Sequence, residues 1–337
     1  MRPFAYGHPG DVAEAVRDVA AEPNAVFLAG GTNLVDHLKL GIATPDLVVD
    51  VRTLTSREIT DLPDGGLRLG AASTNSEVAA DRRVRERYRV LAQALLAGAT
   101  GQLRNMATTG GNPLQRTRCV YFQDVTTPCN KREPGSGCSA VGGYTRYHAV
   151  LGVDAALPDP AAPETCIAAH PSDMAVALAA LDAQVQVLGP AGARTIPFTE
   201  LHRLPGDDPS RDTTLEHGEL VTAIDLPPLP AGTRSAYRKV RDRASYAFAL
   251  VSVAAVVRGD DVRIALGGVA HKPWRATRAE ELLRGRPLTA DAVRAAMDAE
   301  LAAAQPQPGT DGGNGFKIPL VARTVAATLR ELTEAQP

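Results

Sequence analysis

The stretch that decides the fold of this 337-residue chain is Ala25-Val26-Phe27-Leu28-Ala29-Gly30-Gly31-Thr32-Asn33-Leu34. Its apolar first half is a strand candidate that runs directly into a pair of glycines, and a helical segment follows. Glycines there let successive backbone N–H groups turn outward, and a helix N-terminus adds positive potential, which together suit a diphosphate. The motif is not G-x-G-x-x-G and lacks the lysine of a P-loop. Taken alone, it is either a tight turn or a phosphate-binding turn.

A second glycine turn, Thr108-Thr109-Gly110-Gly111-Asn112, follows a long Ala- and Leu-rich helix predicted at Val90–Ala99. Both turns combine a glycine pair with neighbouring hydroxyl or amide side chains. Together they favour an extended ligand that contains phosphate groups, more strongly than either turn does alone.

Helical and strand patterns alternate outside these turns. Asp11 is placed as the N-cap of a helix with apolar residues at helical spacing, and strands are predicted at Leu47–Val51 and Leu67–Ala71. A helix at Met174–Leu181 precedes a strand at Val185–Leu188. Such alternation indicates packed layers of helices and sheets.

A proline cluster, Pro227–Pro230, marks a predicted domain junction. Beyond it, strands at Phe248–Val257 and Val262–Gly267 flank a turn and predict a β-hairpin. The last helix is predicted near Leu320–Leu332, and Trp274 is expected to pack in a core and not to stack on a ligand. The domains predicted are 1–226, with subdomains at about 1–54 and 55–226, and 227–337.

Four cysteines, Cys119, Cys129, Cys138 and Cys166, lie in the middle of the chain with the spacing C-x9-C-x8-C-x27-C. They belong to a segment, 114–167, in which periodicity fades and which is unusually long for irregular chain inside a domain. The spacing is neither the paired C-x2-C of most zinc sites nor a ferredoxin run. A thiolate set suits zinc or an iron–sulfur cluster. Unpaired thiols are a weaker alternative. Two disulfides are another, because a chain of this size with no signal peptide has little need of them.

Composition excludes several classes of protein. The net charge is −2, so no general nucleic-acid surface is implied, and no apolar run approaches the roughly 18 residues that span a membrane. The N-terminus lacks the apolar core of a secretory signal, so a cytoplasmic location is expected; export together with a partner would leave the same sequence. No G-x-S-x-G elbow indicates a hydrolase. His37, His148 and His170 show no ligand spacing and are assigned surface or core roles.

In its order of motifs the chain resembles the FAD-binding subunit of molybdenum hydroxylases, the xanthine dehydrogenase and aldehyde oxidoreductase family. The resemblance covers essentially the whole length and is carried by both glycine turns, by Pro171-Ser172-Asp173 and by Ala249-Leu250-Val251-Ser252-Val253-Ala254. The branch with an iron–sulfur cluster, the medium subunit of periplasmic aldehyde oxidoreductases, is most similar. Three segments carry that likeness: Arg118-Cys119-Val120-Tyr121-Phe122, Cys129-Asn130-Lys131-Arg132 and Gly135-Ser136-Gly137-Cys138-Ser139-Ala140.

The resemblance implies an α+β fold: a two-part FAD-binding domain of the PCMH/vanillyl-alcohol-oxidase type with an inserted iron–sulfur loop, then a C-terminal α+β domain of the CO dehydrogenase flavoprotein type. It implies a [4Fe–4S] cluster held by all four cysteines. It also implies a small [2Fe–2S] subunit and a large molybdenum-cofactor subunit as partners, with electrons passing from the large subunit through this chain to an external acceptor.

The same resemblance assigns cofactor-binding residues. The FAD diphosphate would lie against the backbone of Val26, Phe27, Leu28, Ala29, Gly30, Gly31, Thr32, Asn33 and Leu34, completed by Thr108, Gly111 and Asn112. Asp173 would bond flavin-side hydroxyls, although its position alone favours a helix cap. Val221, in the segment Leu220–Ile224, would pack on the flavin ring, with Lys239 and Lys317 near the flavin. Asn33 replaces an acid common in the family, and binding should survive because the backbone does most of it.

Three interpretations stand side by side. The first is the electron-transfer flavoprotein subunit just described. The second is a flavoprotein oxidase of the same fold that acts alone, and the third is a zinc-stapled binding or scaffold protein. A further hypothesis concerns Arg116, Arg118, Lys131 and Arg132, which lie near the cysteines in sequence. Some of them would raise the potential of a cluster or meet an acidic partner surface.

Overall fold

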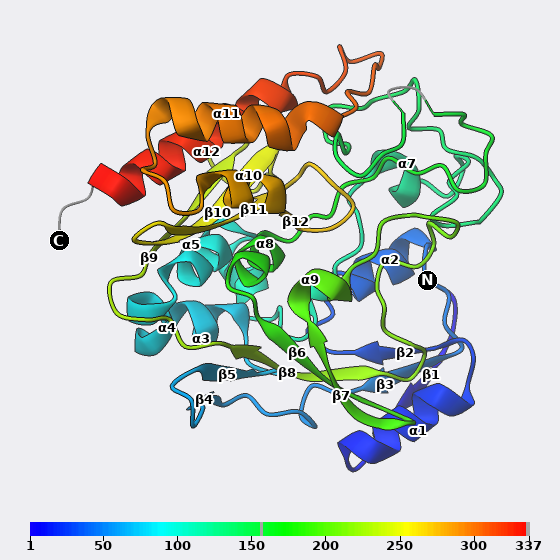
Figure 1. Cartoon of the computed structure of the whole chain (residues 1–337). Coiled ribbons are helices and arrows are strands. Elements are labelled where there is room, and N and C mark those ends of the chain that lie inside the picture. The colour runs from blue at the N-terminus through cyan, green and yellow to red at the C-terminus, as the bar shows by residue number, and fades with distance from the viewer. Residues whose placement is uncertain (156–157, 335–337) are drawn as a thin grey trace.

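A computed structural model of the protein describes residues 1–155 and 158–334, and in it three β-sheets organise the chain (Figure 1). The N-terminal sheet is parallel, with strand order β1-β3-β2. Its strands and helices are β1 (Ala5–Gly7), α1 (Val12–Ala21), β2 (Ala25–Leu28), α2 (Leu34–Leu40) and β3 (Leu47–Asp50). The Asp11 carboxylate accepts a hydrogen bond from Glu14 N, which confirms the predicted N-cap.

The central sheet is antiparallel with strand order β4-β5-β8-β6-β7. Its strands are β4 (Ile59–Asp61), β5 (Leu67–Gly70), β6 (Gln184–Gly189), β7 (Gly192–Pro197) and β8 (Leu220–Leu226). Both edge strands, β4 and β7, are largely exposed and polar, so their sequences carry little of the apolar alternation that marks β6.

Helices cover this sheet and separate it from the C-terminal one. They are α3 (Asn75–Ala80), α4 (Arg82–Arg87), α5 (Arg89–Ala97), α6 (Gly101–Arg104), α8 (Asp173–Ala180) and α9 (Phe198–Leu201). All eight residues of α8 are buried, because the helix lies between the central sheet and the C-terminal sheet and contacts α5, β10 and β11 (Figure 1). A helix that is apolar all round is the expected occupant of such a position.

The C-terminal part contains the antiparallel sheet β12-β11-β10-β9, covered on its outer face by α10 and α12, on which α11 packs. Its elements are β9 (Arg234–Val240), β10 (Val251–Arg258), β11 (Asp261–Gly267), β12 (Trp274–Arg275), α10 (Thr277–Leu283), α11 (Ala290–Glu300), the 3-10 turn η2 (Leu301–Ala303) and α12 (Lys317–Glu334). The predicted hairpin is confirmed as β10 and β11. Trp274 packs against this core and donates its indole N–H to Glu300, as expected.

Alternate residues of β10 serve two different cores. Ala254 and Val256 join the core formed with α5 and α8, whereas Val253, Ala255 and Val257 face the helices α11 and α12. The C-terminal sheet is therefore buried on both faces.

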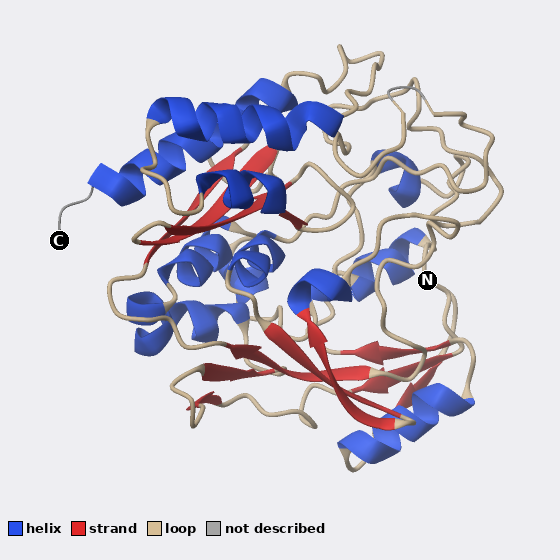
Figure 2. Ribbon diagram, viewed as in Figure 1, coloured by secondary structure: helices blue, strands red, loops and turns tan. Residues whose placement is uncertain are grey.

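The predicted cysteine loop, residues 114–167, is mostly irregular over its described residues (Figure 2). Within its described residues, α7 (Val120–Gln123) is the one helix, and the 3-10 turn η1 (Asn112–Leu114) precedes it. Asn130 holds the loop together: its side-chain amide donates to Ala162 O and Thr165 O, and its Oδ1 accepts from Gly137 N. No helix in the described parts of the chain is long and apolar enough to cross a membrane.

Candidate functional site

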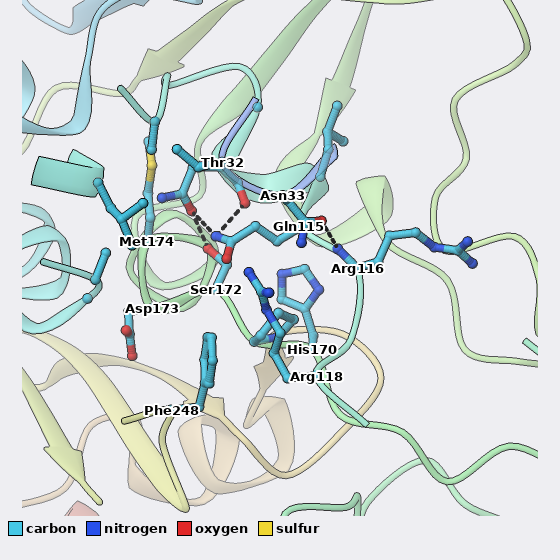
Figure 3. A pocket seen from close by; sticks show the side chains of 18 of the residues that line it. Thr32, Asn33, Gln115, Arg116, Arg118, His170, Ser172, Asp173, Met174 and Phe248 are labelled. Atoms are coloured by element: carbon cyan, nitrogen blue, oxygen red, sulfur yellow. Dashed lines mark hydrogen bonds between the residues drawn. The ribbon is translucent and has the colours of Figure 1, made fainter. Parts of the chain in front are cut away.

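A cavity of about 1360 Å³ lies where the two glycine turns, the start of α8, strand β8 and the C-terminal sheet meet (Figure 3). It exceeds the roughly 300–1,000 Å³ of sites for drug-sized ligands and has room for a dinucleotide. The residues of the wall are spread along the chain from Phe27 to Asp311, so the cavity depends on contacts between parts of the fold that are distant in sequence.

The first glycine turn forms one wall. Phe27 and all residues from Ala29 to Leu34 line the cavity, whereas Val26 and Leu28 do not. Successive strand residues point to opposite faces, so only alternate members of β2 can reach the cavity with their side chains. The prediction for residues 26–34 concerns their backbone amides, so for Val26 and Leu28 it stays a prediction.

The two turns are packed directly against each other. A Cβ built on Gly30 would lie 2.0 Å from the carbonyl oxygen of Met106, so this position admits no side chain. Gly31 has φ of +73°, in the left-handed region that glycine adopts freely. Gly30 thus permits a close contact between two backbone segments, and Gly31 permits a turn of the backbone. Neither position fills the cavity with a side chain.

The second turn forms the adjoining wall with Thr108, Gly110, Gly111 and Asn112. Thr108 Oγ1 accepts from Gly111 N at 3.3 Å and closes the turn. The Asn112 side-chain oxygen accepts from Ser172 Oγ at 2.6 Å and from Gln115 Nε2 at 3.1 Å (Figure 3). The predicted residues Thr108, Gly111 and Asn112 are therefore together at the cavity.

Asp173 is not a helix cap, so that prediction was wrong. Ser172 caps α8, its Oγ accepting from Ala175 N at 3.0 Å, and Asp173 is the first helical residue. The carboxylate of Asp173 instead accepts from Lys239 Nζ at 2.8 Å and from the Tyr237 hydroxyl. Burial and the neighbouring carboxylate raise the pKa of Tyr237 well above its ordinary value. Asp173 and Lys239 both line the cavity.

Of the two remaining residues predicted to lie near the flavin, only one lines the cavity. Val221 of β8 lines the cavity. Lys317 does not: it is fully buried at the start of α12, where Nζ donates to His148 O and Gly268 O, each at 2.8 Å. Because no acid pairs with it in the described structure, burial lowers the pKa of Lys317 to about 7. Lys317 stands behind the wall, since His148 and Gly268 line the cavity.

Asn33 connects the first turn to the cysteine loop. Its Oδ1 accepts from Arg116 N at 3.0 Å, and its Nδ2 lies 3.4 Å from His37 Nε2 (Figure 3). An oxygen acceptor is all that the Arg116 amide requires, and an aspartate would supply one as well. The exchange of the family's acid for Asn33 therefore keeps this contact and removes one negative charge from the turn.

The four cysteines are free thiols that line one small second cavity. Cys129 and Cys138 face each other in an antiparallel bridge. Burial raises the pKa of Cys119 and Cys166 to about 12, so these sulfurs ionise only if a cation compensates. Among the described residues, no three or more His, Cys, Asp or Glu side chains are arranged to hold a single metal ion.

The two cavities share a wall. Thr117 and Cys119 line both the large cavity and the cysteine cavity. A group bound by the four cysteines and a ligand in the large cavity would therefore be neighbours, although most of the cysteine loop lies far along the chain from the glycine turns.

The basic residues near the cysteines are largely engaged within the chain. Arg116 Nε and Lys131 Nζ bind the two oxygens of Asp212, at 2.7 and 2.6 Å, and hold the pKa of that carboxyl well below its usual range. The Arg132 guanidinium donates to carbonyls of the loop, including Tyr121 O at 2.8 Å. All three are engaged by groups of the chain itself, and a role toward a cluster or a partner surface stays a hypothesis for them.

Arg118 differs from the other three. Its guanidinium lies over the Phe248 ring, 5.1 Å from the centroid, and the acid nearest to it in the described structure is Asp36 at 3.9 Å. Both Arg118 and Phe248 line the large cavity (Figure 3). Its buried Nε has no hydrogen-bond partner among the described residues. Arg118 thus directs its charge toward the ligand cavity.

Three histidines reach the site although no motif in the sequence indicates it. His37, His148 and His170 all line the large cavity, and His148 Nε2 lies 3.1 Å from Cys119 Sγ. No motif could have revealed this last contact, because the two residues are 29 positions apart in irregular chain.

Comparison with known proteins agrees with this arrangement. Residues 2–229 match the model of the FAD binding domain in molybdopterin dehydrogenase, and residues 235–332 match the CO dehydrogenase flavoprotein C-terminal domain. The chain is 50% identical to the aldehyde oxidoreductase FAD-binding subunit PaoB of Escherichia coli over 98% of both proteins. It is 26% identical to the glyceraldehyde dehydrogenase medium chain of Sulfolobus acidocaldarius, over 86% of this chain and 84% of that protein.

The fold is also similar to that of a solved structure. A chain of reconstituted CO dehydrogenase from Oligotropha carboxidovorans superposes with a TM-score of 0.75 at 23% identity, covering 99% of this chain and 100% of that one. This likeness confirms the predicted combination of an FAD-binding domain with a C-terminal domain of the CO dehydrogenase flavoprotein type. The chain therefore belongs to the molybdenum hydroxylase family of oxidoreductases, as one of its FAD-binding subunits.

Proposed function

We propose that this chain is the electron-transfer flavoprotein subunit of a molybdenum-dependent aldehyde oxidoreductase. In this role it binds FAD in the large cavity and a [4Fe–4S] cluster at Cys119, Cys129, Cys138 and Cys166. The observation that carries the proposal is the shared wall, in which Thr117 and Cys119 line both cavities. Two redox groups placed there would be close enough to exchange electrons.

The cysteine cavity has the surroundings that a cluster requires. Backbone N–H groups donate toward three of the sulfurs, as they do where iron–sulfur potentials are tuned: from Tyr121 and Phe122 to Cys119, from Ala140, Val141 and Ile167 to Cys138, and from Ala168 to Cys166. Lys131 adds positive charge near Cys166. These groups would offset the charge of buried thiolates.

A single zinc ion fits less well. It would need its sulfur ligands about 2.3 Å from one point, and the described side chains form no such group. A cubane cluster is wider than one ion and holds its thiolates further apart. All four cysteines line one common cavity, and we propose that it holds a cluster and not a single zinc ion.

In the large cavity, the residues present fit a flavin dinucleotide. The backbone of the two glycine turns would bind the diphosphate, and Asp173, Lys239 and Val221 would surround the remainder. The cofactors supply the redox chemistry, while the chain binds them, orients them and fixes their separation.

The proposed partners are a large molybdenum-cofactor subunit, a small [2Fe–2S] subunit and an external electron acceptor. The support is 50% identity over nearly the whole length to a protein named as a subunit of an aldehyde oxidoreductase. Another relative, from Hydrogenophaga pseudoflava, is named a medium chain of carbon monoxide dehydrogenase. Both names describe parts of larger complexes.

The test is cofactor analysis of the purified chain and of its Cys166→Ser variant. We expect bound FAD with about four iron and four sulfide per chain in the parent, and loss of iron with retention of FAD in the variant. Zinc in place of iron would overturn the cluster. Aldehyde oxidation by the chain alone, without partner subunits, would instead support the oxidase that acts by itself.

A further inference from the structure

One of the four cysteines occupies a special place. Cys119 lines both cavities, whereas Cys129, Cys138 and Cys166 line only the smaller one. If all four hold a cluster, the sulfur of Cys119 is the ligand atom nearest to the ligand cavity. Any group that changes the electron density on this sulfur acts on the side of the cluster that faces the flavin.

A histidine contacts this sulfur directly. His148 Nε2 lies 3.1 Å from Cys119 Sγ, and the same imidazole lines the large cavity. The side chain is buried, and its other ring nitrogen, Nδ1, has no hydrogen-bond partner among the described residues. The contact with sulfur is thus the one hydrogen bond that the described structure gives this ring.

The direction of that hydrogen bond follows from the ligand chemistry. A cysteine that binds iron does so as a thiolate, which has no proton to donate. The Nε2 atom must then carry the proton and donate to sulfur, and Nδ1 is the bare nitrogen of the neutral ring.

The backbone of His148 is fixed from three sides. Its N–H donates to Thr145 O at 2.8 Å, and its carbonyl accepts from Lys317 Nζ at 2.8 Å and from Asn314 Nδ2 at 3.1 Å. Lys317, which does not reach the ligand cavity, therefore anchors the residue that does. Asn314 and Lys317 come from the C-terminal part of the chain, so the domain after Pro227 sets the position of an imidazole in the cysteine loop.

We infer that His148 is a positioning residue that donates an N–H···S hydrogen bond to Cys119 and raises the reduction potential of the cluster. Such a bond stabilises the reduced cluster more than the oxidised one, because reduction places more negative charge on the sulfurs. The inference rests on the proposed function, since it requires Cys119 to be a cluster ligand. Lys317 acts one step further away by holding the His148 backbone.

The other buried histidines do not share this geometry. His170 and His202 pack edge to face against each other, with ring centroids 4.4 Å apart. His271 is also buried, and its ring lies beside the backbone of Cys166 but makes no hydrogen bond to a sulfur atom in the described structure. His271 is therefore a matched control: its replacement removes a buried imidazole but no bond to sulfur.

The experiment is a redox titration of the holoprotein, with the reduced cluster measured by EPR, for the parent, His148→Phe, His148→Gln and His271→Phe. At a fixed potential we expect the ratio of reduced to oxidised cluster to fall roughly three- to tenfold in His148→Phe. The glutamine variant, which keeps an N–H donor, should lose less, and His271→Phe should match the parent.

The outcomes separate this inference from the proposed function. A parent protein without iron and sulfide refutes the cluster itself. Clusters at parental content in both His148 variants, with titration curves that coincide with the parent, refute the role of His148. Equal shifts in His148→Phe and His271→Phe also refute it, because they would show a general effect of buried polarity. If His148→Phe loses iron, His148→Gln decides the question.

Discussion

The glycine turns and the cysteine loop border the same cavity but are held in place by opposite means. In the turns, backbone packs on backbone, as at Gly30 against Met106 O, and regular strands and helices fix both ends. In the loop, long side chains reach back to the main chain, as Asn130 does to Ala162 O and Thr165 O. The turns therefore tolerate almost no added volume, whereas the loop depends on particular polar atoms and on whatever its cysteines bind.

The largest expected effect lies in the turns. Gly30→Ala places a methyl group in contact with a backbone carbonyl, and we expect a loss of about 3 kcal/mol of stability together with loss of bound FAD. Chemical denaturation and FAD retained after desalting would measure both. Gly101→Ala is the control, since its added Cβ meets nothing within 4 Å and should leave FAD and stability unchanged.

The next effect lies in the loop and should spare the turns. Asp212→Asn leaves Lys131 and Arg116 without their shared carboxylate. We expect a loss of about 2 kcal/mol, below the usual figure for buried pairs because the side chain of Asp212 is 28% exposed. Iron content should fall while FAD stays bound. Loss of FAD before iron would show that the two regions are not held independently.

The ion pairs of Asp212 with Arg116 and Lys131 also predict how stability changes in acid. The folded protein holds the pKa of Asp212 below its unfolded value of about 3.9. The ionised carboxylate therefore makes its full contribution to the free energy of unfolding above that pH, and this contribution is lost as the pH falls below about 4. The difference in unfolding free energy between the parent and Asp212→Asn should therefore shrink on acidification. A difference that is constant down to pH 3 would contradict the ion pair.

The buried Lys317 predicts how stability changes as the pH rises above neutrality. Its folded pKa is about 7, below the unfolded value of about 10.4, so the unfolded chain binds an extra proton between these values and stability rises with pH. Lys317→Met should lose this rise, as urea unfolding at pH 7 and pH 9 would show. A rise of equal size in both proteins would mean that the ammonium is not buried.

The smallest expected effect lies at the link between the two regions. Asn33→Ala removes the acceptor for Arg116 N and should cost about 1 kcal/mol, with little change in FAD affinity because the backbone of the turn remains. Asn33→Asp keeps an acceptor and should cost less. Urea unfolding and fluorescence titration with FAD would check both values. A large loss of FAD in Asn33→Ala would show that the side chain, and not the backbone, governs binding.

Local patterns predicted most of the fold. The strands β3, β5 and β6 and the hairpin β10–β11 follow from apolar runs, and the cap at Asp11 follows from residue type. The cap of α8 was misplaced by one residue, because Ser172 and Asp173 are both good caps and only tertiary contacts decide between them. Asp173 was drawn away from capping by Tyr237 and Lys239, which lie more than 60 positions later in the chain.

The site was predictable where it depends on backbone and not where it depends on contacts across the fold. A glycine pair marks a turn that must stay free of side chains, and residues 29–34 around the first pair lie at the cavity. The contact of His148 with Cys119 and the anchoring of His148 by Lys317 join parts of the chain with no common motif. Pairings of this kind arise from the arrangement of three sheets, which no local pattern contains.

The fully buried helix α8 has a mechanical consequence. Its residues pack in one core with Ala254, Val256 and Ala265 of the C-terminal sheet, while its first turn carries Asp173 into the ligand cavity. The part of the chain after Pro227 therefore cannot swing as a hinged lid without breaking a continuous core. In the proposed role, in which the chain holds two redox groups, this helix would keep their separation constant, and rates of electron transfer should be insensitive to solvent viscosity.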